Sequence, residues 1–211
     1  MSDKPKIRVL VADDHMVVRM GLATIIGHET DMEVVAEAAN GEEVLQSARA
    51  LSPDVIVMDL RMPGRPGDEV IAALCTENPK ARVIVVTIHK GDEAAYRALR
   101  AGARGYLLKD APTDDIVAAI RTVHTGGRSI PPAIADQLAE RLSRTALSPR
   151  ELEVLKLIAE GCSNKEVAAQ LGITEATAEK HMTNVLTKLG ARDRTHAVRL
   201  GLERGIIDLE T

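Results

Sequence analysis

Five polar residues that could take part in phosphoryl chemistry end or directly follow short apolar runs of the chain. They are Asp13, Asp14, Asp59, Thr87 and Lys109. A carboxylate can act as a nucleophile and form an aspartyl phosphate, and clustered carboxylates attract a hard cation with oxygen ligands, such as Mg²⁺. A lysine supplies a point charge for a phosphoryl oxygen. Because phosphoryl transfer depends mainly on positioning and charge neutralisation, these residue types could serve it together.

The elements that would position these residues are short apolar runs that alternate with amphipathic helical patterns over the first 125 or so residues. Several runs are nearly continuous β-branched stretches, typical of parallel strands that are buried on both faces. The pattern predicts a doubly wound α/β domain with a five-stranded parallel sheet. The expected strands are Ile7–Ala12, Glu33–Ala36, Val55–Met58, Val83–Thr87 and Gly105–Leu108. The expected helices are His15–Ile26, Gly41–Ala50, Asp68–Glu77, Asp92–Ala101 and Thr113–His124.

In such a sheet the carboxyl ends of the strands share one edge, where ligands bind. Any single aspartate at a strand end can be an ordinary solvated loop residue. The combination of three carboxylates, a threonine and a lysine on four strand ends instead favours a site for a phosphoryl group and a cation.

The chain changes character after the fifth predicted helix. Gly126-Gly127 ends that helix, and Pro131-Pro132 starts a new segment with a short linker helix over Pro132–Arg144. From Leu147 the pattern is purely helical, with no strand. We therefore predict domains at 1–126 and 147–211, joined by a linker at 127–146.

The second domain is predicted to be a small all-α domain of four short helices, with N-caps at Ser148, Ser163, Thr174 and Asp193. Glu151 and Glu166 follow the first two caps by three residues and complete capping boxes. A tight turn at Gly172-Ile173 joins the second and third helices, the arrangement of a helix-turn-helix whose second helix enters the major groove.

The third of these helices has two distinct faces. Ala178, Met182, Val185 and Leu189 form an apolar stripe for the domain core. Lys180, Asn184 and Lys188 recur on another face, where the first two could read base edges and Lys188 could contact phosphate. An ordinary solvated helix face stays an alternative, since residues 146–211 carry nine basic against ten acidic side chains. The expected DNA contacts are Thr174, Thr177, Glu179, Lys180, Thr183, Asn184 and Lys188.

The stretches VLVADDH, VIVMDLRMPG, VIVVT and GARGYLLKD resemble receiver domains of two-component systems, over roughly residues 5–125. The resemblance implies a flavodoxin-like strand order 2-1-3-4-5 and Asp59 as the phospho-acceptor. It also implies that Asp13, Asp14, Asp59 and the main-chain carbonyl of Arg61 hold Mg²⁺. Lys109 would then pair with the phosphate, Thr87 would be the switch hydroxyl, and Tyr106 would be the switch aromatic that rotates to bury its ring.

The stretch from LSPRELEVLKL to RDRTHAV closely resembles the LuxR-type DNA-binding domain over about 50 residues, so the whole chain is similar to NarL/FixJ-type response regulators. The resemblance implies a sensor histidine kinase as phosphodonor and dimeric binding to paired half-sites. The last helix, about Arg194–Arg204, would form the dimer contact through Val198 and Leu202. Many members carry a base-contacting lysine where this chain has Glu179, so base preference does not carry over.

Composition excludes several classes of protein. The net charge of −4 argues against a non-specific nucleic-acid coat protein, and the aromatic content of 1% argues against readers of single strands, which stack bases on rings. The N-terminus MSDKPK has no apolar stretch, and no run is long enough for a membrane span. We expect a soluble, cytoplasmic protein.

Two other functions compete with that of a phosphorylation-controlled transcription factor. A receiver-coupled enzyme lacks support, because no catalytic motif such as HExxH or CxxC follows residue 125. We therefore expect no enzymatic activity beyond phosphoryl transfer to the receiver and its slow self-dephosphorylation. A phosphate-sink or protein-interaction regulator, whose helical domain does not bind DNA, stays open.

Overall fold

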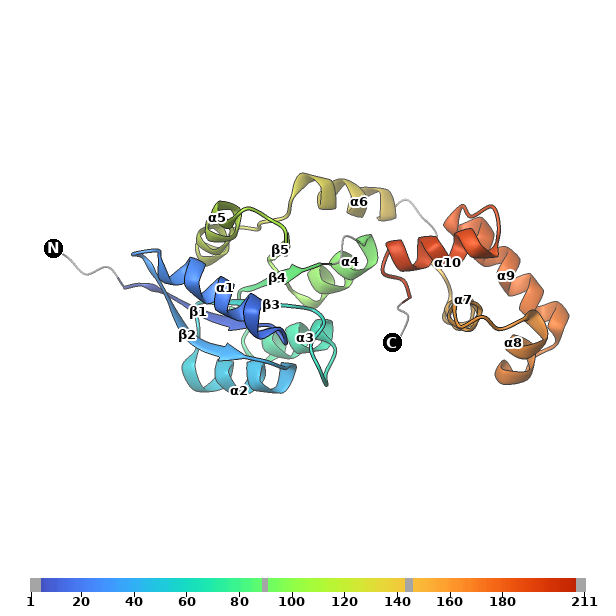
Figure 1. Ribbon diagram of the computed structural model, residues 1–211, viewed down its shortest axis with the longest axis horizontal. Coiled ribbons are helices and arrows are strands. Elements are labelled where there is room, and N and C mark those ends of the chain that lie inside the picture. Colours follow the sequence, from blue (N-terminus) through green and yellow to red (C-terminus); the bar gives the residue numbers. More distant parts are fainter. Residues whose placement is uncertain (1–4, 89–90, 143–145, 208–211) are drawn as a thin grey trace. The chain divides into compact units, whose positions relative to one another are not determined.

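The computed structural model describes residues 5–88, 91–142 and 146–207. It divides into two compact units (Figure 1). The first holds most of the chain up to Pro132, and the second holds residues 133 onward together with the short segment 89–94. The boundary after Pro132 lies inside the segment 127–146, which the sequence predicts as a linker.

The first unit contains a five-stranded parallel sheet in the order β2-β1-β3-β4-β5, which confirms the predicted fold. Its strands are β1 (Ile7–Ala12), β2 (Met32–Ala38), β3 (Val55–Met58), β4 (Val83–Thr87) and β5 (Gly105–Leu108). Only β2 is longer than predicted, because pairing with β1 extends from Met32 to Ala38. As an edge strand, β2 exposes Glu33 and Glu37, which interrupt the apolar run that marks the other strands.

Helices cover both faces of this sheet (Figure 1). They are α1 (Met16–Gly27), α2 (Gly41–Leu51), α3 (Gly67–Glu77), α4 (Asp92–Ala101) and α5 (Thr113–His124). Helix α1 packs against α5, and α2 packs against α3. Buried side chains of α1 and α5, among them Ile26 and Ile120, form one core with strand residues such as Val9, Val57 and Ile84. This burial holds the strand ends rigidly in place.

The second unit is helical, as predicted. Helix α6 (Pro132–Leu142) precedes α7 (Pro149–Ala159), α8 (Asn164–Leu171), α9 (Glu175–Leu189) and α10 (Arg194–Glu203). The expected last residues of the linker helix, 143–144, lie outside the described residues. The structure confirms all four predicted N-caps and both capping boxes. Gly172 ends α8 with a φ of 65°, a conformation that favours glycine and allows the tight turn into α9.

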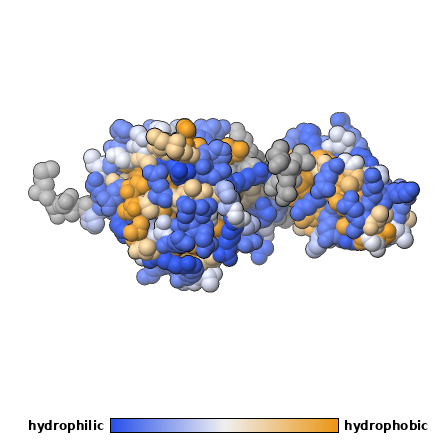
Figure 2. Space-filling view, turned by 60° about the horizontal axis from the view of Figure 1, so that its bottom comes forward, coloured by the Kyte–Doolittle hydropathy of each residue, from blue (hydrophilic) through white to orange (hydrophobic). Residues whose placement is uncertain are grey.

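The apolar stripe predicted for α9 is also confirmed. Ala178, Met182, Val185 and Leu189 are buried in one cluster, together with residues of α7 such as Leu155 and with residues of α8 and α10. The surface outside the two cores is mainly hydrophilic on the face that Figure 2 shows, with apolar residues in small groups. Within the described ranges, no helix combines the length and the apolar character that crossing a membrane requires.

Candidate functional site

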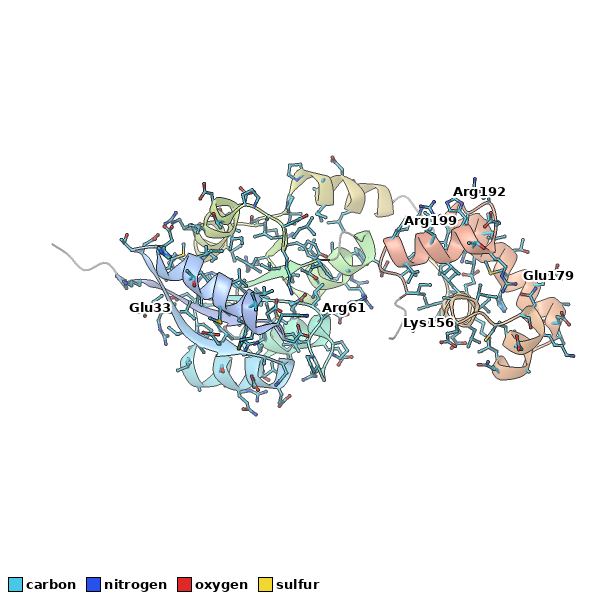
Figure 3. The ribbon with its side chains drawn as sticks, viewed as in Figure 1. Glu33, Arg61, Lys156, Glu179, Arg192 and Arg199 are labelled. Atoms are coloured by element: carbon cyan, nitrogen blue, oxygen red, sulfur yellow. The ribbon has the colours of Figure 1, made fainter. Side chains whose placement is uncertain are left out.

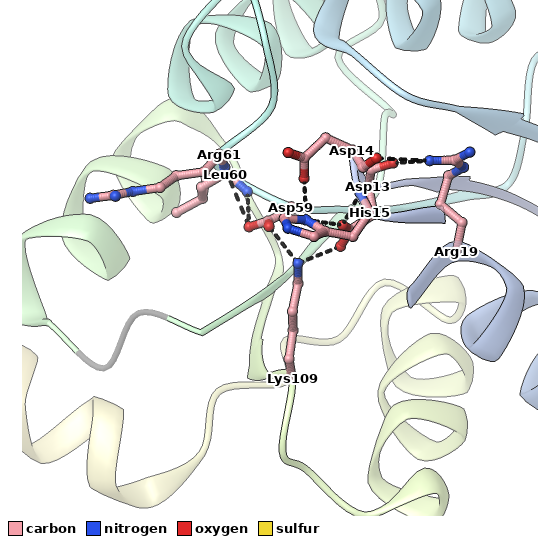
Figure 4. A network of polar contacts seen from close by, with 8 residues as sticks. All are labelled: Asp13, Asp14, His15, Arg19, Asp59, Leu60, Arg61 and Lys109. Carbon is pink, nitrogen blue, oxygen red and sulfur yellow. Dashed lines mark hydrogen bonds and ion pairs between the residues drawn. The ribbon is translucent and has the colours of Figure 1, made fainter. Parts of the chain in front are cut away.

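The polar residues at the strand ends meet at the carboxyl edge of the sheet. The ammonium nitrogen of Lys109, after β5, lies 2.6 Å from Oδ2 of Asp59, after β3, and 2.6 Å from Oδ2 of Asp13, after β1 (Figure 4). Asp13, Asp59 and Thr87 are all buried. The structure thus brings together residues that are up to 96 positions apart in the sequence.

The main chain holds the Asp59 carboxylate in a fixed orientation. Its Oδ1 accepts hydrogen bonds from the backbone N–H groups of Leu60 (2.6 Å) and Arg61 (3.3 Å), while Oδ2 accepts the Lys109 bond. The backbone N–H of Asp59 also donates to the carbonyl of Ala12 on the neighbouring strand (2.9 Å). An aspartate fixed on both sides in this way is suited to act as a nucleophile, because its orientation requires little further ordering.

Asp13 and Asp14 form the other half of the site. Oδ1 of Asp13 accepts the backbone N–H of His15 (2.9 Å), while buried Oδ2 has its ion pair with Lys109 but no hydrogen bond of acceptable geometry among the described residues. Asp14 is more exposed, and its Oδ1 lies 2.7 Å from Nδ1 of His15. Carboxylate oxygens of this kind, one of them buried without a hydrogen bond, fit a hard divalent cation.

Two residues near this site were not predicted from the sequence. Besides its contact with Asp14, His15 contributes one of three groups whose ligand atoms lie within 4.8 Å of one another, the others being Asp13 and Asp14. Arg19, one turn into α1, donates to the main-chain carbonyl of Asp13 (2.6 Å). The only sequence feature that could have indicated a role for either residue is its position within six residues after Asp13.

The electrostatics of the site favour a charged lysine. Burial alone disfavours the ammonium form, but the contacts that the ammonium makes with the carboxylates of Asp13 and Asp59 outweigh it and raise the pKa of Lys109. Burial, with a smaller contribution from the Asp59 charge, raises the pKa of the Tyr106 hydroxyl. Both side chains therefore keep their protons at neutral pH.

Thr87 and Tyr106, the residues expected to act as a switch, are both fully buried. The carbonyl of Thr87 accepts the backbone N–H of Lys109 (2.9 Å), so the end of β4 is joined directly to the lysine. The Tyr106 ring is buried, which is the position expected of the switch aromatic after phosphorylation.

In the second unit, α9 presents most of the predicted DNA-contacting residues on its exposed face. Glu179, Lys180, Thr183 and Asn184 are exposed, and Glu179 is labelled in Figure 3. At the start of the helix, the Thr174 hydroxyl accepts the Thr177 backbone N–H (3.2 Å) and therefore caps α9.

Lys188, the residue expected to contact phosphate, has two partners inside its own unit. Its ammonium donates to Oε2 of Glu151 (2.7 Å) and to the carbonyl of Ala146 (3.2 Å). Its direction differs from that of Lys180 because every four-residue step along a helix turns by about 40°. Two such steps carry Lys188 about 80° away from Lys180, onto the flank of the buried stripe.

The predicted dimer contacts are only partly accessible. Val198 and Leu202 on α10 are half-buried and pack against the core of their own unit. Only the exposed part of each side chain is available for contact with a second copy of the chain. The dimer contact stays a prediction.

Comparisons with known proteins agree with the division into two units. A family model described as "Response regulator receiver domain" matches residues 9–121. A second, described as "Bacterial regulatory proteins, luxR family", matches residues 145–200. The first covers the sheet with its acidic edge, and the second covers α7 to α9 and most of α10.

Two relatives match over almost the whole chain. The transcriptional regulatory protein LiaR of Bacillus subtilis (strain 168) is 42% identical over 199 residues, covering 90% of this chain and 94% of LiaR. The transcriptional regulatory protein LnrK of the same strain is 36% identical over 216 residues, covering 95% of this chain and 98% of LnrK.

Solved structures of similar proteins include RcsB of Salmonella enterica serovar Typhimurium, bound to a promoter in the presence of the phosphomimetic BeF3−. It matches with a TM-score of 0.73 at 25% identity, over 95% of this chain and 99% of RcsB. The response regulator ChrA of a heme-sensing two-component system matches with a TM-score of 0.58 at 37% identity, over 97% of this chain and 100% of ChrA. This chain therefore belongs to the NarL/FixJ-type response regulators, transcriptional regulators that join a receiver domain to a LuxR-family DNA-binding domain.

Proposed function

We propose that phosphorylation of Asp59 by a partner histidine kinase controls dimerisation of this regulator and its sequence-specific binding to promoter DNA. The observation that carries the proposal is the geometry of Asp59, whose carboxylate is fixed by two backbone N–H groups and paired with Lys109. The domains that perform the two steps are the receiver (1–126) and the helix-turn-helix domain (147–211), joined by the linker 127–146.

In the transfer step, a carboxylate oxygen of Asp59 attacks the phosphorus of a phosphohistidine. The P–O bond forms as the P–N bond breaks, and the imidazole leaves with the bonding electron pair. Lys109, which already contacts the Asp59 carboxylate, would then pair with an oxygen of the transferred phosphoryl group. The Thr87 hydroxyl would donate a hydrogen bond to another phosphoryl oxygen, and this bond would link the phosphorylated site to β4.

A bound Mg²⁺ would neutralise charge on the phosphoryl oxygens during this transfer. Asp13, Asp14, Asp59 and the main-chain carbonyl of Arg61 are the groups that would hold it. The oxygen ligands around Asp13 support this choice of ion, because Mg²⁺ prefers carboxylate and carbonyl oxygens over other ligands.

In the binding step, α9 would enter the major groove. Lys180 and Asn184 would contact base edges with Glu179 and Thr183 beside them, while Thr174 and Thr177 would face phosphates. RcsB, which is similar over almost its whole length, has been solved on promoter DNA, and this supports double-stranded DNA as the partner. Binding as a dimer through Val198 and Leu202 of α10 would match paired half-sites.

The proposed activity ends with DNA binding, so we expect no catalysis beyond transfer to Asp59 and its slow reversal. Because its target would be promoter DNA of a bacterial chromosome, the protein would act in the cytoplasm.

The proposal is tested with the full-length protein, with and without beryllofluoride and Mg²⁺. A randomised library of duplexes is passed over the protein, retained DNA is sequenced, and affinity for an enriched duplex is measured at one salt concentration. We expect enrichment of a sequence with paired half-sites and tighter binding by the beryllofluoride form. A helical domain that enriches no sequence in either form would instead indicate a regulator that binds protein.

A further inference from the structure

An ion pair joins the recognition helix α9 to the first turn of α7. Nζ of Lys188, in the last turn of α9, lies 2.7 Å from Oε2 of Glu151. The Glu151 side chain is only 5% exposed and that of Lys188 is 24% exposed. A pair this well shielded from water is screened less by salt than one on the surface.

Both partners are also bonded to the main chain at the start of α7. The same carboxylate oxygen of Glu151 accepts the backbone N–H of Ser148 (2.7 Å), and the Lys188 ammonium donates to the carbonyl of Ala146 (3.2 Å). Burial alone raises the pKa of Glu151, but hydrogen bonds from Lys188 and Ser148 outweigh it and lower that pKa. The carboxylate is therefore ionised at neutral pH, and the last turn of α9 is bonded to a defined point of the neighbouring helix.

The ion pair adds a directional contact to the apolar packing of α9. The contacts of Ala178, Met182 and Val185 hold the helix against the core, and the bond from Lys188 fixes one point of its last turn to α7. Lys180 and Asn184 lie on the exposed face of the same helix. Because side-chain tips lie about 5–6 Å from the helix axis, a rotation of about 20° moves them by about 2 Å, enough to lose a hydrogen bond to a base.

We infer that the Lys188–Glu151 pair is a positioning device for DNA recognition. Lys188 makes no contact with DNA, and it holds α9 in the orientation that presents Lys180 and Asn184 to the base edges. The inference rests on the proposed function, since it presumes that α9 reads DNA.

The experiment uses the full-length beryllofluoride form and two duplexes, one enriched by the wild type and one of scrambled sequence. Dissociation constants are measured over a range of salt concentrations for the wild type, Lys188→Ala, Lys188→Arg and Glu151→Gln. Lys156→Ala, which removes an equal charge from an exposed position on α7, is the matched control. The slope of log affinity against log salt reports how many phosphates are neutralised.

We expect Lys188→Ala and Glu151→Gln to lose about tenfold or more of their preference for the enriched duplex, while the salt slope on the scrambled duplex stays at the wild-type value. Lys188→Arg should recover most of the preference, because a guanidinium can also pair with Glu151. Lys156→Ala should keep the wild-type preference for the enriched duplex. Glu151→Gln is decisive, since it leaves Lys188 in place, so a loss of preference cannot come from a deleted lysine–DNA contact.

Two results would overturn the inference. One is a slope that falls by about one in Lys188→Ala with unchanged sequence preference, which identifies a phosphate contact. The other is wild-type preference in Glu151→Gln. If Lys188→Ala does not fold, Glu151→Gln and Lys188→Arg decide the question by the same criteria. If the wild type enriches no duplex at all, the proposed function itself fails before any variant is measured, and this inference fails with it.

Discussion

Lys109 lies 2.6 Å from Asp59, and the same ammonium group lies 2.6 Å from Asp13. The lysine thus bridges the proposed phospho-acceptor and a proposed metal ligand. Asp13 follows β1 and Asp59 follows β3, and these two strands are paired with each other. A divalent cation held by Asp13 and Asp59 would carry a charge of the same sign as Lys109. Its binding would therefore be electrostatically coupled to the lysine.

The first prediction concerns the acceptor. Asp59→Asn should abolish incorporation of acid-labile phosphate from acetyl phosphate in the presence of Mg²⁺, because the amide is a poor nucleophile. Asp114→Asn, which changes an exposed aspartate on α5, is the control and should incorporate phosphate like the wild type. Persistent labelling of Asp59→Asn at full stoichiometry would show that the acceptor lies elsewhere.

The second prediction follows from the bridging lysine. Lys109→Met should bind Mg²⁺ at least about tenfold more tightly than the wild type, because it removes a positive charge that competes for Asp13 and Asp59. Phosphate incorporation should be lost at the same time. Isothermal titration calorimetry measures the affinity, with the exposed Lys80→Met as control. An unchanged or weaker Mg²⁺ affinity would mean that Lys109 does not compete with the ion.

The third prediction concerns signal transmission. Thr87→Ala should still be phosphorylated at Asp59 but should lose the gain in DNA affinity, since it lacks the hydroxyl that would draw the end of β4 toward the phosphoryl group. Thr87→Ser keeps the hydroxyl and should retain most of the gain. Phosphate stoichiometry and DNA affinity are measured on the same samples. A Thr87→Ala protein that responds to phosphorylation like the wild type would place the coupling in another residue.

The fourth prediction concerns the stability of the second unit. Folding lowers the pKa of Glu151 below its ordinary value of 4.5, so the stability that its charge contributes is present above that value. This contribution is lost as the pH falls through the lowered pKa of the folded protein. At pH 7, breaking this buried pair in Glu151→Gln should cost about 3 kcal/mol, toward the lower end for such pairs.

The measurement is the difference in melting temperature between the wild type and Glu151→Gln, followed by circular dichroism from pH 7 to pH 3. The difference should be largest near neutral pH and should shrink below about pH 4.5. The exposed Glu153→Gln should differ little from the wild type at any pH. A difference between wild type and Glu151→Gln that stays constant over this range would contradict an ionised, paired Glu151.

Much of the fold was predictable because its signals are local. The β-branched runs identified β1, β3, β4 and β5, and serine followed three residues later by glutamate marked where α7 and α8 begin. The members of the acidic edge were also predictable, since the parallel topology fixes which end of each strand meets which other end. The edge strand β2 was underestimated because its exposed glutamates break the apolar run.

Only the tertiary structure decided which polar side chains face one another. Lys188 shares its sequence spacing with Lys180 and Asn184, yet Glu151, 37 residues earlier, binds it from another helix. Lys109 likewise contacts Asp13 and Asp59, although the three residues follow three different strands, β5, β1 and β3. The backbone hydrogen bonds of a helix and its apolar periodicity depend on residues that are close together in the sequence. The partner of a long charged side chain instead depends on which other elements pack beside it and on how far water is excluded there.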